Sequence, residues 1–170
     1  MAEIVLIRHG QTEWSAVGKH TSYTDLDLTG AGEQQARVAG QRLAGRSFAA
    51  VISSPRKRAL RTAELAGLAV TETTEDLAEW NYGEYEGITS ATIHETSPAW
   101  SLWTDGAPGG ESPAEVGERL DRVLARARTF LEAVRHGPRL PEPETRIGQR
   151  PARSRGIGSG RPNPSSSARP

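Results

Sequence analysis

EIVLIRHG (residues 3–10) joins a short apolar run to two basic side chains and a glycine. Three residues of the run are β-branched, which favours an extended backbone, and the glycine ends it. A run of this length predicts a short strand that is buried on both faces, as in a parallel sheet. Because ligands bind outside the carboxyl ends of such strands, Arg8 and His9 are expected beside a ligand site.

Further strands and helices alternate after this first strand. Residues 48–53 form a second apolar run, which leads into Ser54 as a helix N-cap and Pro55 at the first helical position. Thr29 is the expected N-cap of an amphipathic helix, and residues 69–73 are expected to form another strand. This alternation predicts an α/β domain with a largely parallel sheet.

The clearest helix signal begins at Ser112. Ser112 as the N-cap, Pro113 at the first position and Glu115 three residues after the cap make a capping box. Apolar residues at helical spacing follow as far as Val134 and predict a long amphipathic helix. A shorter helix is expected around residues 91–95, inside a loop-rich stretch.

Length and composition exclude several classes of protein. The chain has 170 residues and a mass of 18.3 kDa, which suits one domain. It has no cysteine, which excludes disulfides, thiolate metal sites and cysteine nucleophiles. It contains no run of 18 apolar residues and no signal-peptide pattern at its start, so we expect no membrane span and a cytoplasmic location.

The composition changes near Gly137. The chain as a whole has no net charge, but residues 137–170 hold seven of its 21 basic and only two of its 21 acidic residues. The same segment holds seven of the 11 prolines. Such a segment buries too little apolar surface to offset the entropy cost of ordering it. The sequence predicts a folded domain over residues 1–136 and a disordered Arg/Pro/Ser/Gly-rich tail over residues 137–170.

Arg8 and His9 suit chemistry at a phosphoryl group. A guanidinium presents two donors to two phosphate oxygens, and a neutral imidazole nitrogen attacks phosphorus. SSPRKRA (53–59) repeats the order of strand, turn, helix N-terminus and arginine, so Arg58 is expected to face the same anion. The alternatives are a histidine that merely packs at a strand end and a solvated basic face over residues 56–58.

EWNYGEYEG (79–87) interleaves acidic, aromatic and glycine residues. The carboxyl of Glu79, beside Trp80 and Tyr82, is expected to be partly desolvated, which suits a general acid. The alternative is an ordinary surface loop.

Five motifs occur in one order along residues 1–136, namely IRHGQTEW (7–14), LTGAGEQQA (28–36), SSPRKRALRTA (53–63), LAEWNYGEYEG (77–87) and GGES (109–112). Together they resemble the histidine phosphatase superfamily, the phosphoglycerate-mutase-like enzymes. The resemblance implies a three-layer α/β/α fold with a largely parallel sheet, incomplete here at its C-terminus. It also implies hydrolysis of a small soluble phosphomonoester through a phosphohistidine, with no metal or other cofactor and no membrane or nucleic-acid partner.

The resemblance assigns a role to individual residues. His9 corresponds to the nucleophile and Glu79 to the acid that protonates the leaving oxygen. Arg8 and Arg58 correspond to the two arginines that hold the phosphoryl group. The motif around the nucleophile adds Gln11, Thr12, Glu13 and Ser15 to the pocket. Ser15 stands where the family pattern has asparagine, so one phosphate contact is expected to be weaker.

Two departures from the family pattern concern activity. Only 22 residues separate Gly87 from Gly110, where the mutases carry a long insertion, and a more open pocket favours hydrolysis over phosphoryl transfer. The family pattern also continues, after the long helix, into an apolar strand that ends in His-Gly and completes the phosphate pocket. Here His136 follows a helical stripe instead, and it is not expected to reach the pocket. His20 and His94 lack motif context and are expected at the surface.

The missing strand leaves several functions open. We expect impaired phosphomonoester hydrolysis; an inactive remnant and mutase-type phosphoryl transfer are the alternatives. The tail resembles translation of GC-rich DNA out of frame, and a natural disordered tail that binds a proline-recognition domain or nucleic acid is the alternative. A one-base shift after codon 136 that restores an apolar strand ending in His-Gly would decide its origin.

Overall fold

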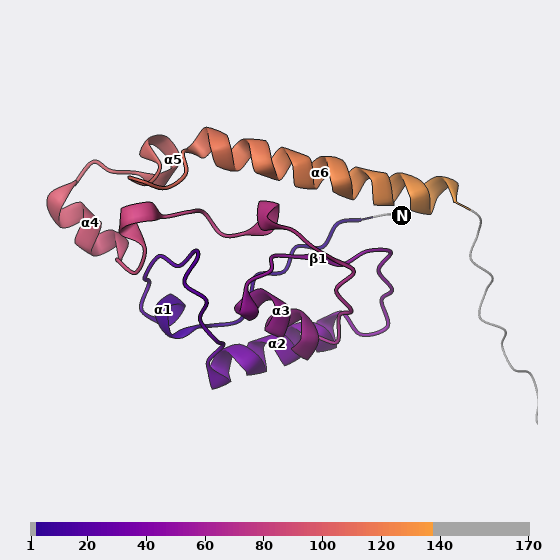
Figure 1. Ribbon diagram of the computed structural model, residues 1–170. Helices are drawn as coiled ribbons and strands as arrows, with labels where there is room; N and C mark the ends of the chain where they lie inside the picture. The colour runs from indigo at the N-terminus through magenta and orange to yellow at the C-terminus, as the bar shows by residue number, and fades with distance from the viewer. Residues whose placement is uncertain (1–2, 138–170) are drawn as a thin grey trace, which may run out of the picture. The chain divides into compact units, whose positions relative to one another are not determined.

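The computed structural model describes residues 3–137 (Figure 1). The chain divides into two units, Met1–Gly137 and Pro138–Pro170, and all of the described residues belong to the first. The disorder predicted for residues 137–170 therefore concerns a segment that lies, apart from Gly137, outside the described residues.

The first unit has three layers (Figure 1). Helix α6 (Pro113–His136) covers one side of the strands, and helices α2 (Gly30–Arg42) and α3 (Lys57–Leu65) cover the other. Strand β1 (Ile52–Ser53) pairs in parallel with β2 (Glu72–Thr73), with Ile52 opposite Glu72. The predicted α/β fold with a parallel sheet is confirmed, although both strands are shorter than predicted.

The strand predicted over residues 3–7 does not form. Among the described residues, no backbone hydrogen bond joins residues 3–9 to another segment. Leu6 is 91% exposed, and Ile4 and Ile7 are exposed as well. A strand requires a hydrogen-bonded neighbour. In the described part of the chain β1 pairs only with β2, and no third strand bridges β1 and residues 3–7.

Three helices form where the sequence predicted them, two of them at their predicted caps. Thr29 caps α2, accepting a hydrogen bond from the Gly32 amide, and α4 (Ser90–Thr96) matches the short helix expected around residues 91–95. The side chains of Ser112 and Glu115 form the predicted capping box at the start of α6, with Pro113 at its first position.

Helix α3 begins later than predicted. Its N-cap is Arg56 rather than Ser54, because residues 54–56 make a turn before the helix. The Ser54 hydroxyl accepts only a long hydrogen bond, 3.4 Å, from the Arg56 amide. The Lys57 amide instead donates to the carboxylate of Asp25 at 2.8 Å, so a residue distant in sequence supplies a cap that the local pattern assigned to serine.

Four further short elements complete the unit and were not predicted. They are α1 (Glu13–Ala16), the 3₁₀ turns η1 (Glu75–Leu77) and η2 (Gly83–Tyr85), and α5 (Leu102–Asp105). Helix α6 packs against η1 and α5. Several residues of its apolar stripe remain exposed, among them Leu120, Leu124 and Val134. The rest of the described unit therefore does not cover the whole apolar stripe of α6.

Two glycines bring the segment after residue 9 against helix α2. A Cβ atom at Gly10 would clash with the carbonyl of Gly32, and a Cβ atom at Gly32 would clash with the carbonyl of Gln11. The Gly10 amide also donates to the buried hydroxyl of Thr62 on α3 at 3.0 Å. This close approach fixes the backbone next to His9 against both helices.

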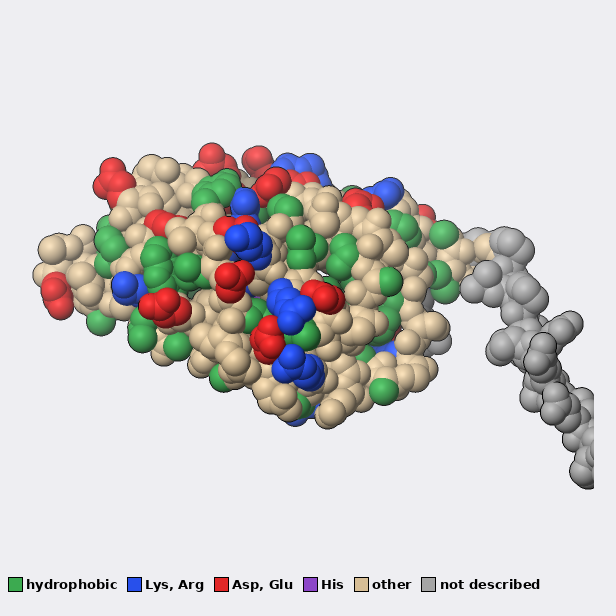
Figure 2. Space-filling view, turned by 60° about the horizontal axis from the view of Figure 1, so that its bottom comes forward, with side chains coloured by type: hydrophobic (Ala, Val, Ile, Leu, Met, Phe, Trp, Pro, Cys, Tyr) green, Lys and Arg blue, Asp and Glu red, His purple; other side chains and the backbone are tan. Residues whose placement is uncertain are grey.

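Charges on the outer helices are mixed. Glu33 on α2 pairs with Arg37 of the same helix at 2.9 Å and with Arg61 of α3 at 2.8 Å. Figure 2 likewise shows basic and acidic side chains side by side on the face in view, rather than gathered into patches of one sign.

Candidate active site

A cavity of about 430 Å³ opens beside the carboxyl end of β1. Arg8, His9, Arg58 and Glu79 all contribute to its lining. They come from the segment before α1, from the first turn of α3 and from the loop after η1. The structure therefore brings together the four residues expected to carry the chemistry, although residues 3–9 are not a strand.

The ring of His9 has a defined hydrogen bond. Its Nδ1 lies 2.7 Å from the carbonyl oxygen of Gly10. Because a carbonyl only accepts, Nδ1 carries the proton, and in the neutral ring Nε2 keeps a free lone pair. Burial lowers the pKa of His9, the Gly10 hydrogen bond opposes this, and the charges of Arg58 and Arg8 add to the lowering. The ring therefore stays neutral, and nucleophilic, to a pH below its ordinary value of 6.5.

Arg58 is buried, with 2% of its surface exposed. Its Nη1 donates to the carbonyl of Thr24 at 3.1 Å, and its Nη2 donates to the carbonyls of Thr21 and Ser22 at 3.2 and 3.0 Å. Burial lowers the pKa of this guanidinium. The alternative of a solvated basic face over residues 56–58 is therefore wrong for Arg58.

Residues 21–24 connect Arg58 to Glu79. The Glu86 carboxylate accepts hydrogen bonds from the amides of Ser22 and Thr24, at 2.9 and 3.0 Å. The buried Ser22 hydroxyl donates to the carbonyl of Glu79 at 3.1 Å. The sequence did not identify Ser22 or Glu86 as site residues; Glu86 lay within a quoted motif, but nothing local indicated that it holds a distant loop.

Glu79 presents its side chain at the exposed side of the cavity. Its Oε1 accepts a hydrogen bond from the Trp80 amide at 2.9 Å. The residue is exposed, so the partial desolvation predicted from its aromatic neighbours is absent. The reason lies in Trp80, which turns inward: it is buried, and its indole donates to the Glu111 carbonyl at 2.8 Å.

Tyr82 lies close enough to Glu79 to feel its charge, as the sequence predicted, and His20, which was not predicted there, lies beside both. Their rings stack with centroids 4.3 Å apart. Burial and the nearby charge of Glu79 raise the pKa of Tyr82 to about 12. Burial lowers the pKa of His20, and the ring is half-buried, so the prediction of a surface residue is wrong for His20 and confirmed for His94.

The side chains that follow His9 are engaged in local structure. Thr12 is fully buried, and it exchanges hydrogen bonds with Ser15 in a capping box for α1. The side-chain carbonyl of Gln11 accepts a hydrogen bond from the Thr29 hydroxyl at 3.0 Å, and Glu13 is exposed. None of these four lines the cavity beside His9. Their contact with phosphate stays a prediction.

Two other kinds of site are absent from the described residues. Residues 3–137 contain no group of three or more His, Asp or Glu side chains placed to hold a metal ion. Within the same range, no helix has the length and apolar character needed to cross a membrane.

Comparison with known proteins gives consistent matches. Residues 4–139 match the family described as the histidine phosphatase superfamily, branch 1. The chain is 50% identical over 126 residues to an acid phosphatase of Mycobacterium tuberculosis, which covers 73% of this chain and 62% of that protein. It is 35% identical over 146 residues to sedoheptulose 1,7-bisphosphatase of Saccharomyces cerevisiae, covering 72% of this chain and 54% of the relative.

Solved structures show the same fold. The structure of open reading frame Rv3214 from M. tuberculosis matches with a TM-score of 0.67 and 48% identity, over 75% of this chain and 64% of that one. TTHB049 from Thermus thermophilus matches with a TM-score of 0.61 and 38% identity, over 70% and 69% of the two chains. The match spans 62% and 54% of the two curated relatives above, less than two thirds of each.

Proposed function

Because the chain belongs to the histidine phosphatase superfamily, we propose that it hydrolyses phosphomonoesters of small soluble substrates through a phosphohistidine at His9. The observation that carries the proposal is the hydrogen bond from His9 Nδ1 to the Gly10 carbonyl, in a cavity that Arg8 and Arg58 also line. It leaves Nε2 as the nucleophile, and the two guanidiniums supply positive charge for the phosphoryl oxygens.

The reaction needs two steps. In the first, His9 Nε2 attacks phosphorus, the bond to the leaving oxygen breaks, and protonated Glu79 gives its proton to that oxygen. In the second, the Glu79 carboxylate takes a proton from water, the water oxygen attacks phosphorus, and the P–N bond breaks. Inorganic phosphate leaves, and both His9 and Glu79 return to their starting states.

Hydrolysis is favoured over mutase chemistry by the length of the loop between motifs. Only 22 residues separate Gly87 from Gly110, which leaves the Glu79 side of the cavity open to water. The 50% identical relative is named an acid phosphatase, whereas three relatives named phosphoglycerate mutase are 33–35% identical.

We also propose that turnover is impaired, with an inactive remnant as the second candidate. The observation that favours impairment concerns residues 3–9, which include both His9 and Arg8. In the described part of the chain, the backbone of these residues forms no hydrogen bond with another segment, so no sheet holds the two side chains in place. His136, which was not expected to replace the second pocket histidine, ends helix α6, as its helical pattern predicted, and its side chain lies outside the described part of the chain.

Hydrolysis of p-nitrophenyl phosphate by the purified chain tests the proposal. Turnover is expected to persist in excess EDTA, because Arg8 and Arg58 provide the positive charge, and to be blocked by vanadate, which mimics the five-coordinate phosphorus. Loss of turnover in EDTA with recovery on adding a divalent ion would contradict it.

Glu79→Gln is expected to reduce the turnover of different substrates by different factors, depending on the basicity of the leaving group. A general acid contributes about 10²–10⁴-fold, and it matters most when the leaving alkoxide is strongly basic. Turnover of an alkyl phosphate should therefore fall much further than turnover of p-nitrophenyl phosphate. Glu84→Gln, which changes an exposed carboxyl in the nearby turn η2, is the matched control. Equal losses for both substrates would remove Glu79 from the acid role.

A further inference from the structure

Arg119, in the second turn of α6, makes an unusually complete set of contacts. Its side chain is only 9% exposed. Its Nε and Nη2 donate to the two carboxylate oxygens of Glu111 at 2.7 and 3.0 Å. Its Nη1 donates to the carbonyls of Asp76 and Ala78 at 2.9 and 2.8 Å. One guanidinium therefore ties helix α6 both to a half-buried carboxylate and to the backbone just before Glu79.

Glu111 extends this connection to the other side of Glu79. Its Oε2 accepts a hydrogen bond from the Asn81 amide at 2.7 Å. Its own amide donates to the Asn81 carbonyl at 2.9 Å, and its carbonyl accepts from the Trp80 indole at 2.8 Å. The chain is thus held through the Ala78 carbonyl, immediately before Glu79, and through the Trp80 indole and the Asn81 backbone, immediately after it.

We infer that Arg119, acting through Glu111, is a positioning residue that fixes the Glu79 carboxyl at the cavity; this rests on the acid role proposed for Glu79. Neither Arg119 nor Glu111 is hydrogen-bonded to Glu79 itself. They hold the short span of backbone that carries it, from Ala78 to Asn81. Proton transfer depends steeply on such placement, because a misplacement of about 1 Å can cost about 10²-fold in rate.

Arg119→Lys is the variant that tests this role. A lysine keeps the positive charge, but its single ammonium cannot reproduce a bidentate carboxylate contact together with two carbonyl contacts. Turnover of an alkyl phosphate is expected to fall about tenfold more than turnover of p-nitrophenyl phosphate. In a Glu79→Gln background, Arg119→Lys should add no further difference between the two substrates.

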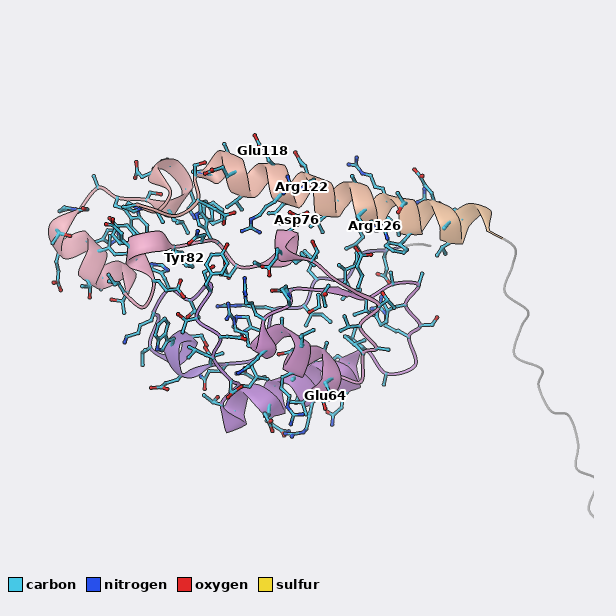
Figure 3. The ribbon with its side chains drawn as sticks, viewed as in Figure 1. Glu64, Asp76, Tyr82, Glu118, Arg122 and Arg126 are labelled. Atoms are coloured by element: carbon cyan, nitrogen blue, oxygen red, sulfur yellow. The ribbon has the colours of Figure 1, made fainter. Side chains whose placement is uncertain are left out.

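Two arginines on the same helix provide controls. Arg126 pairs with Glu72 at 3.0 Å and is 53% exposed, and Arg122 pairs with the Asp76 side chain at 2.6 Å. Figure 3 shows Arg122 extending from α6 toward Asp76. Arg126→Lys and Arg122→Lys keep a charge and an exposed ion pair, and both should leave the ratio of the two substrates unchanged.

Hydrogen exchange at the Trp80 and Asn81 amides gives a second readout that needs no catalysis. Arg119→Lys should accelerate exchange at these two amides, while the amides of helix α3 keep their rates. Glu111→Gln leaves a single carbonyl oxygen for the Asn81 amide and the Arg119 guanidinium, which both need an acceptor there. It should accelerate exchange in the same way, and it serves if Arg119→Lys fails to fold.

The two readouts separate the possible failures. Equal loss on both substrates with unchanged exchange would overturn the positioning role while the proposed phosphatase stands. If the wild-type chain neither turns over substrate nor forms a phosphohistidine, the proposed function fails. Exchange at residues 80 and 81 then still decides whether Arg119 fixes this segment.

Discussion

Replacing His9 with alanine is expected to abolish covalent phosphorylation of the chain and to reduce turnover by at least about 10⁴-fold, the scale seen when a nucleophile is removed. The expectation follows from Nε2, which the hydrogen bond to Gly10 leaves free to attack. The measurement is rapid quenching with labelled p-nitrophenyl phosphate, followed by peptide mapping. The labelled bond should be stable in base and labile in acid, as for phosphohistidine.

A matched control is His94→Ala. His94 is exposed, contacts the carbonyl of Trp100 and takes no part in the cavity lining. It should keep both label and turnover. Label retained by His9→Ala would show that another residue is the nucleophile.

A low free energy of unfolding, below about 5 kcal/mol, is the second large effect that we expect, against about 5–15 kcal/mol for ordinary domains. Ile4, Leu6 and Ile7 and several apolar side chains of α6 lie exposed, and each loses part of the roughly 1.5–3 kcal/mol that full burial of such a side chain contributes. The backbone of residues 4–8 does not add the cost of buried unpaired groups, because most of these residues are exposed. Urea unfolding followed by tryptophan fluorescence measures this free energy.

Two substitutions separate exposed from buried apolar residues. Ile93, at 3% exposure, belongs to the small core, and Ile93→Ala should cost about 2–5 kcal/mol and so unfold much of the protein. Leu6→Ser should change the free energy of unfolding by no more than about 0.5 kcal/mol. A large loss from Leu6→Ser would mean that residues 3–7 are packed in solution, contrary to the structure.

The features predicted correctly from sequence are those that depend on neighbouring residues. The start of α6 is an example, because Ser112, Pro113 and Glu115 supply their own cap. The strand at residues 3–7 failed because a strand also needs a hydrogen-bonded partner, which no local pattern supplies. The start of α3 failed for a related reason, since its cap comes from Asp25.

The same distinction applies to the candidate site. His9, Arg8, Arg58 and Glu79 stand in short motifs, so their presence at one cavity could be predicted. The residues that hold them in place could not be. Arg119 lies 40 positions from Glu79, and in the sequence it is one more arginine on the polar side of an amphipathic helix. Its contacts with two backbone carbonyls arise only when α6 packs against η1.

The contact between Gly10 and Gly32 has a genetic consequence. Gly32 is part of a helix and does not line the cavity, yet any side chain there would press on the carbonyl of Gln11, two residues from the nucleophile. In a mutational scan scored by phosphatase activity, every substitution at Gly32 would therefore register as a loss of function, including the smallest, alanine. A map of active-site residues inferred from mutant phenotypes alone would therefore include Gly32, although its role is to allow close contact between two backbone segments.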